Sequence, residues 1–292
     1  MSQVDSGIIY VAFGYEYVLM ALHSAETSKT ANPSVKYAIV TNSIISDIKR
    51  IQQVFSVIQE VDVENEFNRL AKTSANTYSP FARTLLLDCD TEVNGDLSPM
   101  FDCLDRFDVI AKMNSEPTMK DYKISALIPG DVFPMWNTGA IFFNAGSQAN
   151  RLFSEWQRIF LEMQVNRDQP AFARMIYENP DIKLLSVNCI WNADQLDRRL
   201  FSGKRSKRKI RIWHYREPHQ FLPAARAIYE LHTEIGSIFA KNNQANLAVA
   251  DVERRYQIML KAPLRTYIFG LKTKKSLKRS RKTVGVPLKK NE

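Results

Sequence analysis

Two aspartates one residue apart, Asp88 and Asp90, directly follow an apolar run at residues 84–87. The run is too short and too uniformly apolar for an amphipathic helix, so it predicts a buried strand. At the carboxyl end of a buried parallel strand the chain opens into the crevice where ligands bind, and both carboxylates can face one small volume there. Two like charges so placed favour a cation beside them. The spacing therefore indicates a divalent-metal site for a phosphate-bearing substrate, and a simple polar turn is the alternative that these residues leave open.

The first sixty residues supply a frame for this strand. Runs rich in β-branched and aromatic residues at 7–13, 37–41 and 57–61 predict three strands. Apolar residues at helical spacing predict a helix from about residue 17 and a second helix over 44–55. This alternation is typical of a parallel sheet covered by helices, so we predict an α/β fold with a mostly parallel central sheet.

The later part of the chain is expected to add further strands and helices. The expected strands are 108–112, 140–144, 182–187 and 209–215, and the expected helices are 66–72, 97–104, 147–164, 223–241 and 247–261. Residues 114–135 read as a long irregular loop, which is more often functional than idle. Residues 136–139 are expected to form a turn, and Asp168 is expected to cap a helix that has Pro170 in its first turn.

Composition indicates a globular body with a basic tail. The chain has 292 residues, of which 45% are hydrophobic and 24% charged, as in soluble proteins. Its net charge is +9, but residues 271–292 account for +8 and the first 270 residues for only +1. No run approaches the roughly 18 apolar residues of a membrane helix, and the first residues do not look like a signal peptide. Three widely spaced cysteines fit neither a disulfide framework nor a zinc site, so we expect a reduced, cytoplasmic protein.

Four segments in a fixed order resemble those of GT-A fold glycosyltransferases, specifically the family-8-like branch of nucleotide-diphospho-sugar transferases. They are residues 79–91, with the aliphatic strand and the two aspartates, then Trp136-Asn137-Thr138-Gly139, then Asp168-Gln169, and last Trp213-His214-Tyr215. The resemblance spans most of residues 8–215. It implies a GT-A (Rossmann-like) sheet flanked by helices, with a transferase domain over 1–222, a C-terminal helical extension over 223–270 and a disordered basic tail over 271–292.

The resemblance also implies a metal and a substrate. Asp88, Asp90 and His214 would bind Mn²⁺ or Mg²⁺, which bridges the diphosphate of a nucleotide-sugar donor and offsets the charge of the leaving group. UDP-sugars are the expected donors, and a saccharide or a lipid-linked saccharide is the expected acceptor.

Further residues would hold the donor. The turn Ala12-Phe13-Gly14-Tyr15 would contact the nucleobase and ribose, since an aromatic ring can stack and glycine permits close backbone approach. Around the phosphates and sugar, the resemblance implies Lys72, Arg83, Cys89, Asn137, Thr138 and Arg216 as donor-binding residues and Asp168 and Gln169 as catalytic residues. Gln169 would lie beside the anomeric carbon.

One departure from the family leaves the stereochemistry open. The family usually continues from the histidine through glycine to a phosphate-binding lysine, whereas here Tyr215-Arg216-Glu217 follows His214. Arg216, or the basic loop at 204–209, would then take over the phosphate contact. A retaining reaction is favoured on the resemblance.

Other functions fit the sequence less well. A haloacid-dehalogenase-like phosphatase with Asp88 as nucleophile needs Thr or Val at the position of Glu92, and sugar nucleotidyltransferases open with a basic glycine-rich loop that residues 12–16 lack. The tail and the cluster at 204–211 leave nucleic-acid binding as an unlikely alternative class. The tail would equally suit a peripheral contact with anionic lipid headgroups at the inner face of a membrane.

Overall fold

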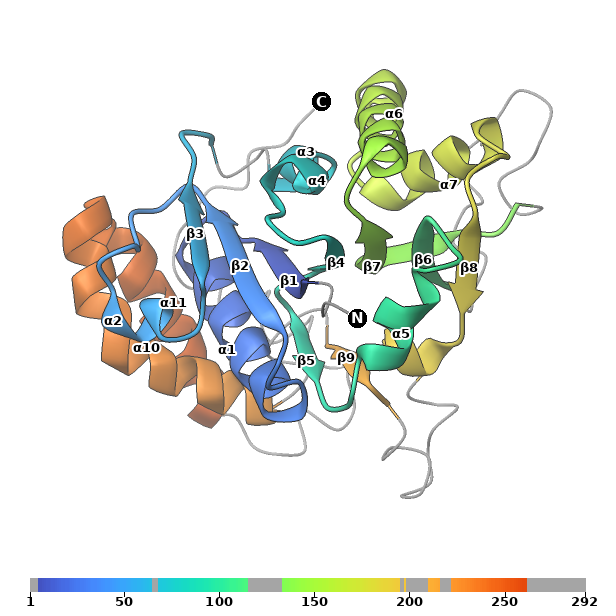
Figure 1. The fold of residues 1–292 in the computed structure, drawn as a ribbon. Coiled ribbons are helices and arrows are strands. Elements are labelled where there is room, and N and C mark those ends of the chain that lie inside the picture. The colour runs from blue at the N-terminus through green and yellow to red at the C-terminus, as the bar shows by residue number, and fades with distance from the viewer. Residues whose placement is uncertain are drawn as a thin grey trace.

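The computed structural model describes residues 5–64, 68–114, 133–194, 197, 210–215 and 222–261. Its centre is a seven-stranded sheet (Figure 1). In spatial order the strands are β3 (Val57–Glu60), β2 (Lys36–Thr41), β1 (Ser6–Val11), β4 (Arg83–Leu87), β7 (Trp136–Asn144), β6 (Val109–Met113) and β8 (Leu184–Val187). Only β7 runs antiparallel to its neighbours, β4 and β6, so the sheet is mostly parallel as expected. A separate two-stranded sheet pairs β5 (Thr91–Val93) with β9 (Ile212–His214).

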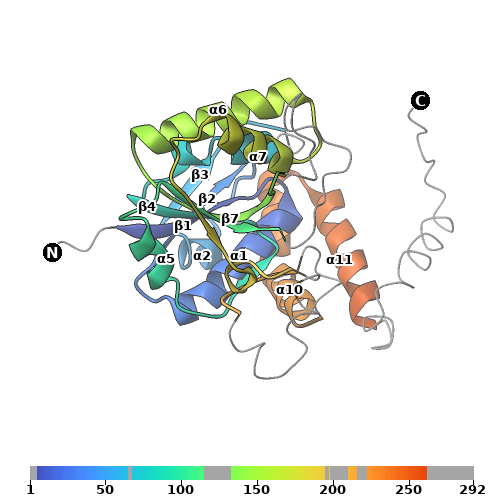
Figure 2. The same cartoon turned by 90° about the vertical axis from the view of Figure 1, so that its right-hand side faces the viewer.

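Helices cover both faces of the central sheet (Figure 2). One face carries α1 (Tyr15–Ala31), α5 (Ser98–Cys103), α10 (Leu222–Asn243) and α11 (Asn246–Lys261), and the other carries α4 (Ala75–Tyr78), α6 (Ser147–Met163) and α7 (Asp168–Glu178). Alternate strand residues feed the two layers: in β1, Ile8 and Tyr10 pack under α1, whereas Ile9 and Val11 face the opposite layer. The C-terminal helices form a hairpin whose first member packs on α1.

The expected helix over 44–55 is wrong for most of its length. Only Lys49–Gln52 (α2) is helical. The amides of Ile45 and Ser46 instead donate to Glu60 Oε1, at 2.7 and 2.8 Å, and Ile44 is 52% exposed. The carboxylate at the end of β3 therefore holds two backbone amides at the start of this segment.

The expected turn at 136–139 is also wrong, because β7 already begins at Trp136. Its first residues pair with Lys112 and Met113 across a bulge between Ala111 and Lys112. The bulge lets the ladder continue over residues whose composition suggested a turn. The expected strand at 209–215 is shorter than predicted and is reduced to β9.

Asp168 is not the N-cap of its helix. Arg167 occupies that position, and Asp168 is the first residue of α7, with no capping hydrogen bond from a side chain. Its carboxylate is used elsewhere, as described below. Among the described residues, no helix has the length and apolar character to cross a bilayer, and Cys89, Cys103 and Cys189 are free thiols.

Candidate active site

Asp88, Asp90 and His214 come together at the carboxyl end of β4. One ligand atom from each residue lies within 4.8 Å of the others. His214 Nε2 is 3.1 Å from Asp90 Oδ1 and 3.9 Å from Asp88 Oδ2. The histidine reaches this edge because β9 pairs with β5, whose first residue, Thr91, is the register partner of His214. A strand more than a hundred residues downstream is thus returned to the two aspartates by a short antiparallel ladder.

The electrostatics of this group suit a divalent cation. Burial raises the pKa of Asp88, and the positive charges of Lys72 and His214 only partly oppose the rise. Burial lowers the pKa of His214, but the charge of Asp90 outweighs that effect and the net shift is upward. Both Asp88 and His214 therefore hold a proton more strongly than usual, at a place where negative charge accumulates. Carboxylate oxygens with one imidazole nitrogen are donors that Mn²⁺ and Mg²⁺ accept, so the residues present fit such an ion.

Lys72, at the end of α3 (Asn68–Lys72), links the metal group to Asp168. Its Nζ lies 2.7 Å from Asp88 Oδ1 and 3.1 Å from Asp168 Oδ2, and Thr138 Oγ1 donates to Asp168 Oδ2 at 2.8 Å. Burial disfavours the charged lysine, but Asp168 and Asp88 more than offset it and raise the pKa of Lys72. Burial alone would raise the pKa of Asp168, whereas Lys72 and Thr138 hold it below its usual value. Lys72 and Asp168 are thus a charged pair inside the site.

Gln169, the next residue of α7, is held by a residue that the sequence analysis did not single out. Asn114 Nδ2 donates to Gln169 Oε1 at 3.1 Å. Asn114 follows the last residue of β6, and a polar residue just past a predicted strand was the available signal. The start of α7 is fixed from the other side, because Trp156 Nε1 donates to the carbonyl oxygen of Asp168 at 3.0 Å.

Asn137 supports the site through hydrogen bonds inside the protein. Its Oδ1 accepts the backbone amide of Gly139 at 2.9 Å and Asn192 Nδ2 at 3.0 Å. Asn192, which the sequence analysis also missed, is fully buried, and its Oδ1 lies 3.1 Å from His214 Nδ1. The carbonyl of Gly139 accepts the Asp88 amide at 2.8 Å. Asn137 therefore has its side-chain oxygen committed to the protein.

Comparison with known proteins bears on the fold. No family model and no curated protein matches the sequence. Solved structures do match. Galactosyltransferase LgtC with donor and acceptor sugar analogs has a TM-score of 0.52 and 14% identity, over 89% of this chain and 98% of that chain. Mouse xyloside xylosyltransferase 1 has a TM-score of 0.50 and 12% identity, over 73% and 98% of the two chains, and glycosyltransferase GlyE from Streptococcus pneumoniae TIGR4 has a TM-score of 0.53 and 12% identity, over 99% and 66%. The chain has the GT-A fold. The predicted GT-A architecture, a mostly parallel sheet flanked by helices and followed by C-terminal helices, is confirmed.

In this GT-A chain the first strand-to-helix turn differs in detail from the expectation. Ala12 and Phe13 are buried, and Gly14 has a φ of 88°, which a side chain would strain. Tyr15 is 3% exposed, packs against Phe239 of α10 and pairs its hydroxyl with His232 Nδ1 at 3.0 Å. Its ring therefore belongs to the core.

Tyr17, two residues further along in α1, is the exposed aromatic residue next to this turn. It is 45% exposed. Burial of its partly covered hydroxyl raises the pKa of Tyr17, and the charges of Cys89 and Asp90 add to the rise. Its phenol thus lies within the field of the metal group. Residue 17 was used above only as the start of an expected helix, so this role was missed.

Two other predicted donor residues have side chains that are engaged elsewhere. Arg83 begins β4, at the end opposite Asp88, and forms ion pairs with Asp105 and Asp102. The Cys89 thiol is buried and donates to the carbonyl of Val11 at 3.3 Å, which leaves only its backbone for a ligand. Arg216 lies outside the described residues, as do the basic loop at 204–209 and most of the loop 114–135.

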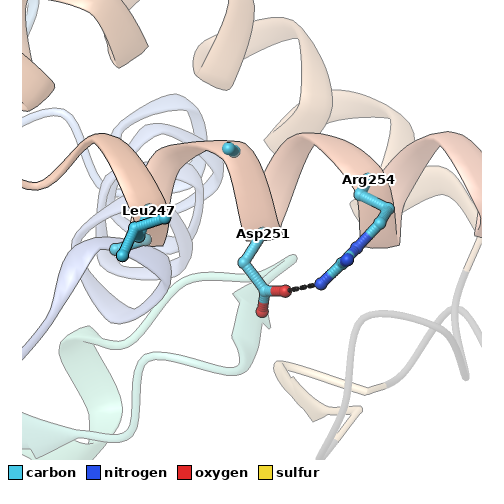
Figure 3. Close-up of a pocket in the computed structure, with 5 residues that line it drawn as sticks. Leu247, Asp251 and Arg254 are labelled. Carbon is cyan, nitrogen blue, oxygen red and sulfur yellow. Dashed lines mark hydrogen bonds and ion pairs between the residues drawn. The ribbon is translucent and has the colours of Figure 1, made fainter. Parts of the chain in front are cut away.

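A surface hollow on α11 is separate from these residues. Figure 3 shows Leu247, Asp251 and Arg254 along its wall, with Arg254 paired to Asp251. None of the predicted site residues lines it.

Proposed function

We propose that this chain is a metal-dependent glycosyltransferase that moves a hexose from a nucleoside-diphosphate sugar, preferentially a UDP-sugar, to a saccharide or lipid-linked saccharide. The observation that carries the proposal is the meeting of Asp88, Asp90 and His214 at the carboxyl end of β4 in a GT-A fold. The structural match to LgtC, which was solved with donor and acceptor sugar analogs, supports the substrate class.

Asp88, Asp90 and His214 would hold Mn²⁺ or Mg²⁺, and the ion, when bound, offsets negative charge on the departing nucleoside diphosphate. The charge balance supports this assignment. Among the described residues, the three carboxylates of Asp88, Asp90 and Asp168 are accompanied by one ammonium, that of Lys72, which leaves two negative charges when His214 is neutral. A divalent cation neutralises that excess.

The donor would enter beside the first strand-to-helix turn. Residues 12–14 supply backbone for the nucleoside, and the exposed ring of Tyr17 takes the stacking role first expected of Tyr15. Arg216, two residues after His214 in the sequence, stays the predicted phosphate contact.

The transferred sugar would lie between Lys72, Asp168 and Gln169. Asp168, kept ionised by Lys72, accepts hydrogen bonds from sugar hydroxyls and does not act as a proton donor. Gln169, oriented by Asn114, presents its amide to the anomeric carbon. An active-site mutant of LgtC in which glutamine is replaced by glutamate is also among the matching structures, at 16% identity, which supports an amide side chain in the active site. A retaining mechanism is part of our proposal.

The test is metal-dependent binding of UDP, measured by calorimetry and by thermal unfolding. Wild-type protein is expected to bind UDP tightly only with Mn²⁺ and to unfold at a higher temperature in its presence, because a ligand specific to the native state stabilises it by mass action. Asp90→Asn is expected to abolish the Mn²⁺ dependence. Asp102→Asn, a matched change at a side chain that is 76% exposed on α5, should leave it intact.

Two results would count against the proposal. One is UDP binding of equal strength with Mn²⁺ and with chelator. The other is an Asp90→Asn variant that is folded and retains the metal dependence of the wild type.

A further inference from the structure

Asn192 occupies an unusual place beneath the proposed metal group. It follows the short 3₁₀ helix η2 (Cys189–Trp191) and has no exposed surface. Its side-chain amide lies between the side chains of Asn137 and His214: Nδ2 donates to Asn137 Oδ1 at 3.0 Å, and Oδ1 lies 3.1 Å from His214 Nδ1. Both ends of the amide are therefore used inside the protein, and one end is used on the histidine.

The direction of each hydrogen bond in this chain follows from one backbone group. The amide of Gly139 can only donate, so the atom of Asn137 that it meets at 2.9 Å must be the acceptor Oδ1. The atom of Asn192 that meets the same Oδ1 must then be the donor Nδ2, which leaves Oδ1 to face the imidazole. His214 Nδ1 must therefore carry a hydrogen, and Nε2 is the nitrogen presented to Asp88 and Asp90.

The backbone of Gly139 restricts the ring as well. A Cβ on Gly139 would lie 2.5 Å from His214 Cε1 and 2.7 Å from Nδ1, so the ring rests directly against the glycine backbone. Without the Asn192 carbonyl, an imidazole beside two carboxylates has an alternative: it can turn and offer an N–H from either nitrogen to Asp90. In that arrangement no lone pair is directed to a shared point between the ligands.

We propose that Asn192 is the positioning residue that fixes the orientation and tautomer of His214 and thereby sets the affinity of this site for a divalent cation. The proposal rests on the proposed function, because it assumes that Asp88, Asp90 and His214 bind the ion. Outer partners of metal-bound histidines commonly contribute about 10–100-fold to metal affinity by this means. Asn192 would do so without touching the ion or the donor.

The experiment is a titration with Mn²⁺, followed by the paramagnetic resonance signal of the free ion, with and without UDP. Asn192→Ala is expected to weaken Mn²⁺ binding by about 10–100-fold. Asn192→Asp keeps an acceptor on His214 Nδ1 and should recover most of the affinity, although it loses the donor to Asn137. Asn188→Ala, which removes an exposed backbone contact to Ile190 in the same segment, is the control and should bind like wild type.

Two outcomes would overturn this proposal without affecting the proposed function. One is a folded Asn192→Ala variant with wild-type affinity, and the other is an Asn192→Asp variant as weak as Asn192→Ala. Failure of the proposed function has a different pattern: wild-type protein would bind no Mn²⁺, or Asp90→Asn would bind it normally.

A spectroscopic readout keeps the proposal testable if Asn192→Ala does not fold. The chain has only four histidines, so ¹⁵N-labelled histidine gives a simple NMR spectrum, and His214→Gln assigns the relevant signals. At alkaline pH, where the ring is neutral, wild-type His214 is expected to be protonated on Nδ1. A neutral His214 protonated on Nε2 would overturn the proposal.

Discussion

Replacing Gly139 by alanine should weaken metal binding through a steric effect on His214. The added Cβ would lie 2.5 Å from His214 Cε1, whereas ordinary contact begins at 3.4 Å, so the ring must recede by about 0.9 Å if the backbone holds. Asn192 opposes that movement through its 3.1 Å contact with Nδ1. Metal–ligand distances tolerate only about 0.2 Å. We therefore expect Mn²⁺ affinity to fall at least about tenfold, which is ~1.4 kcal/mol.

Stability should fall with affinity. Gly139 does not have a positive φ, so alanine can adopt its backbone conformation and would by itself stabilise the fold by about 0.4–1 kcal/mol. Overpacking a filled site costs about 1–3 kcal/mol, so the clash decides the sign and the free energy of unfolding should drop. Urea unfolding and Mn²⁺ titration measure the two effects.

The matched control is Gly95→Ala. There the added Cβ would lie 2.3 Å from Cδ of Arg211, whose flexible side chain can rotate away. This variant should keep the wild-type Mn²⁺ affinity. If Gly139→Ala is folded and binds Mn²⁺ within twofold of wild type, the assignment of a ring packed against Gly139 as a metal ligand is refuted.

Two further substitutions test the charges around the site. Lys112→Met removes the ammonium that lies 2.7 Å from Asp197 Oδ2 in a fully buried pair, and should lower the free energy of unfolding in urea by about 3–5 kcal/mol. Lys36→Met, in an exposed pair with Asp5, should lower it by under about 1 kcal/mol. Equal losses would contradict the assignment of the first pair as buried. Arg83→Ala should leave Mn²⁺-dependent UDP binding unchanged by calorimetry, because Arg83 pairs with Asp102 and Asp105 at the end of β4 opposite Asp88. A loss of UDP binding in a stable Arg83→Ala protein would show that the arginine does reach the donor.

Local patterns carried the prediction of the sheet. Each strand of the parallel half is a short run of branched and aromatic residues, and such runs at 7–13, 37–41 and 84–87 coincide closely with β1, β2 and β4. The errors fall where a distant group competes for the backbone. Glu60 binds the amides of Ile45 and Ser46 at the start of the segment expected to be helical, and β6 pairs with Trp136 and Asn137 where a turn was expected.

The site divides in the same way. Asp88 and Asp90 could be predicted because their chemistry and spacing are local, and the family resemblance then pointed to His214 and Asp168. The partners of Asn114 and Asn192 could not be predicted: the end of a predicted strand was a signal for Asn114 itself, but nothing near either residue in the sequence indicates that one meets Gln169 and the other His214. Tyr15 and Tyr17 show the limit from another side: both are aromatic and two residues apart, and only the packing of α10 on α1 decides which ring is covered.

That packing gives the C-terminal hairpin a connection to the donor turn. Tyr15 at the start of α1 binds His232 of α10, and His232 in turn pairs with Glu253 of α11. Glu16, the next residue of the turn, pairs with Arg255 of α11 at 2.8 Å. The hairpin therefore contacts the two residues that directly follow the backbone proposed to receive the nucleoside. The backbone that follows Gly14 is thus held by contacts with elements more than two hundred residues away as well as by the preceding strand.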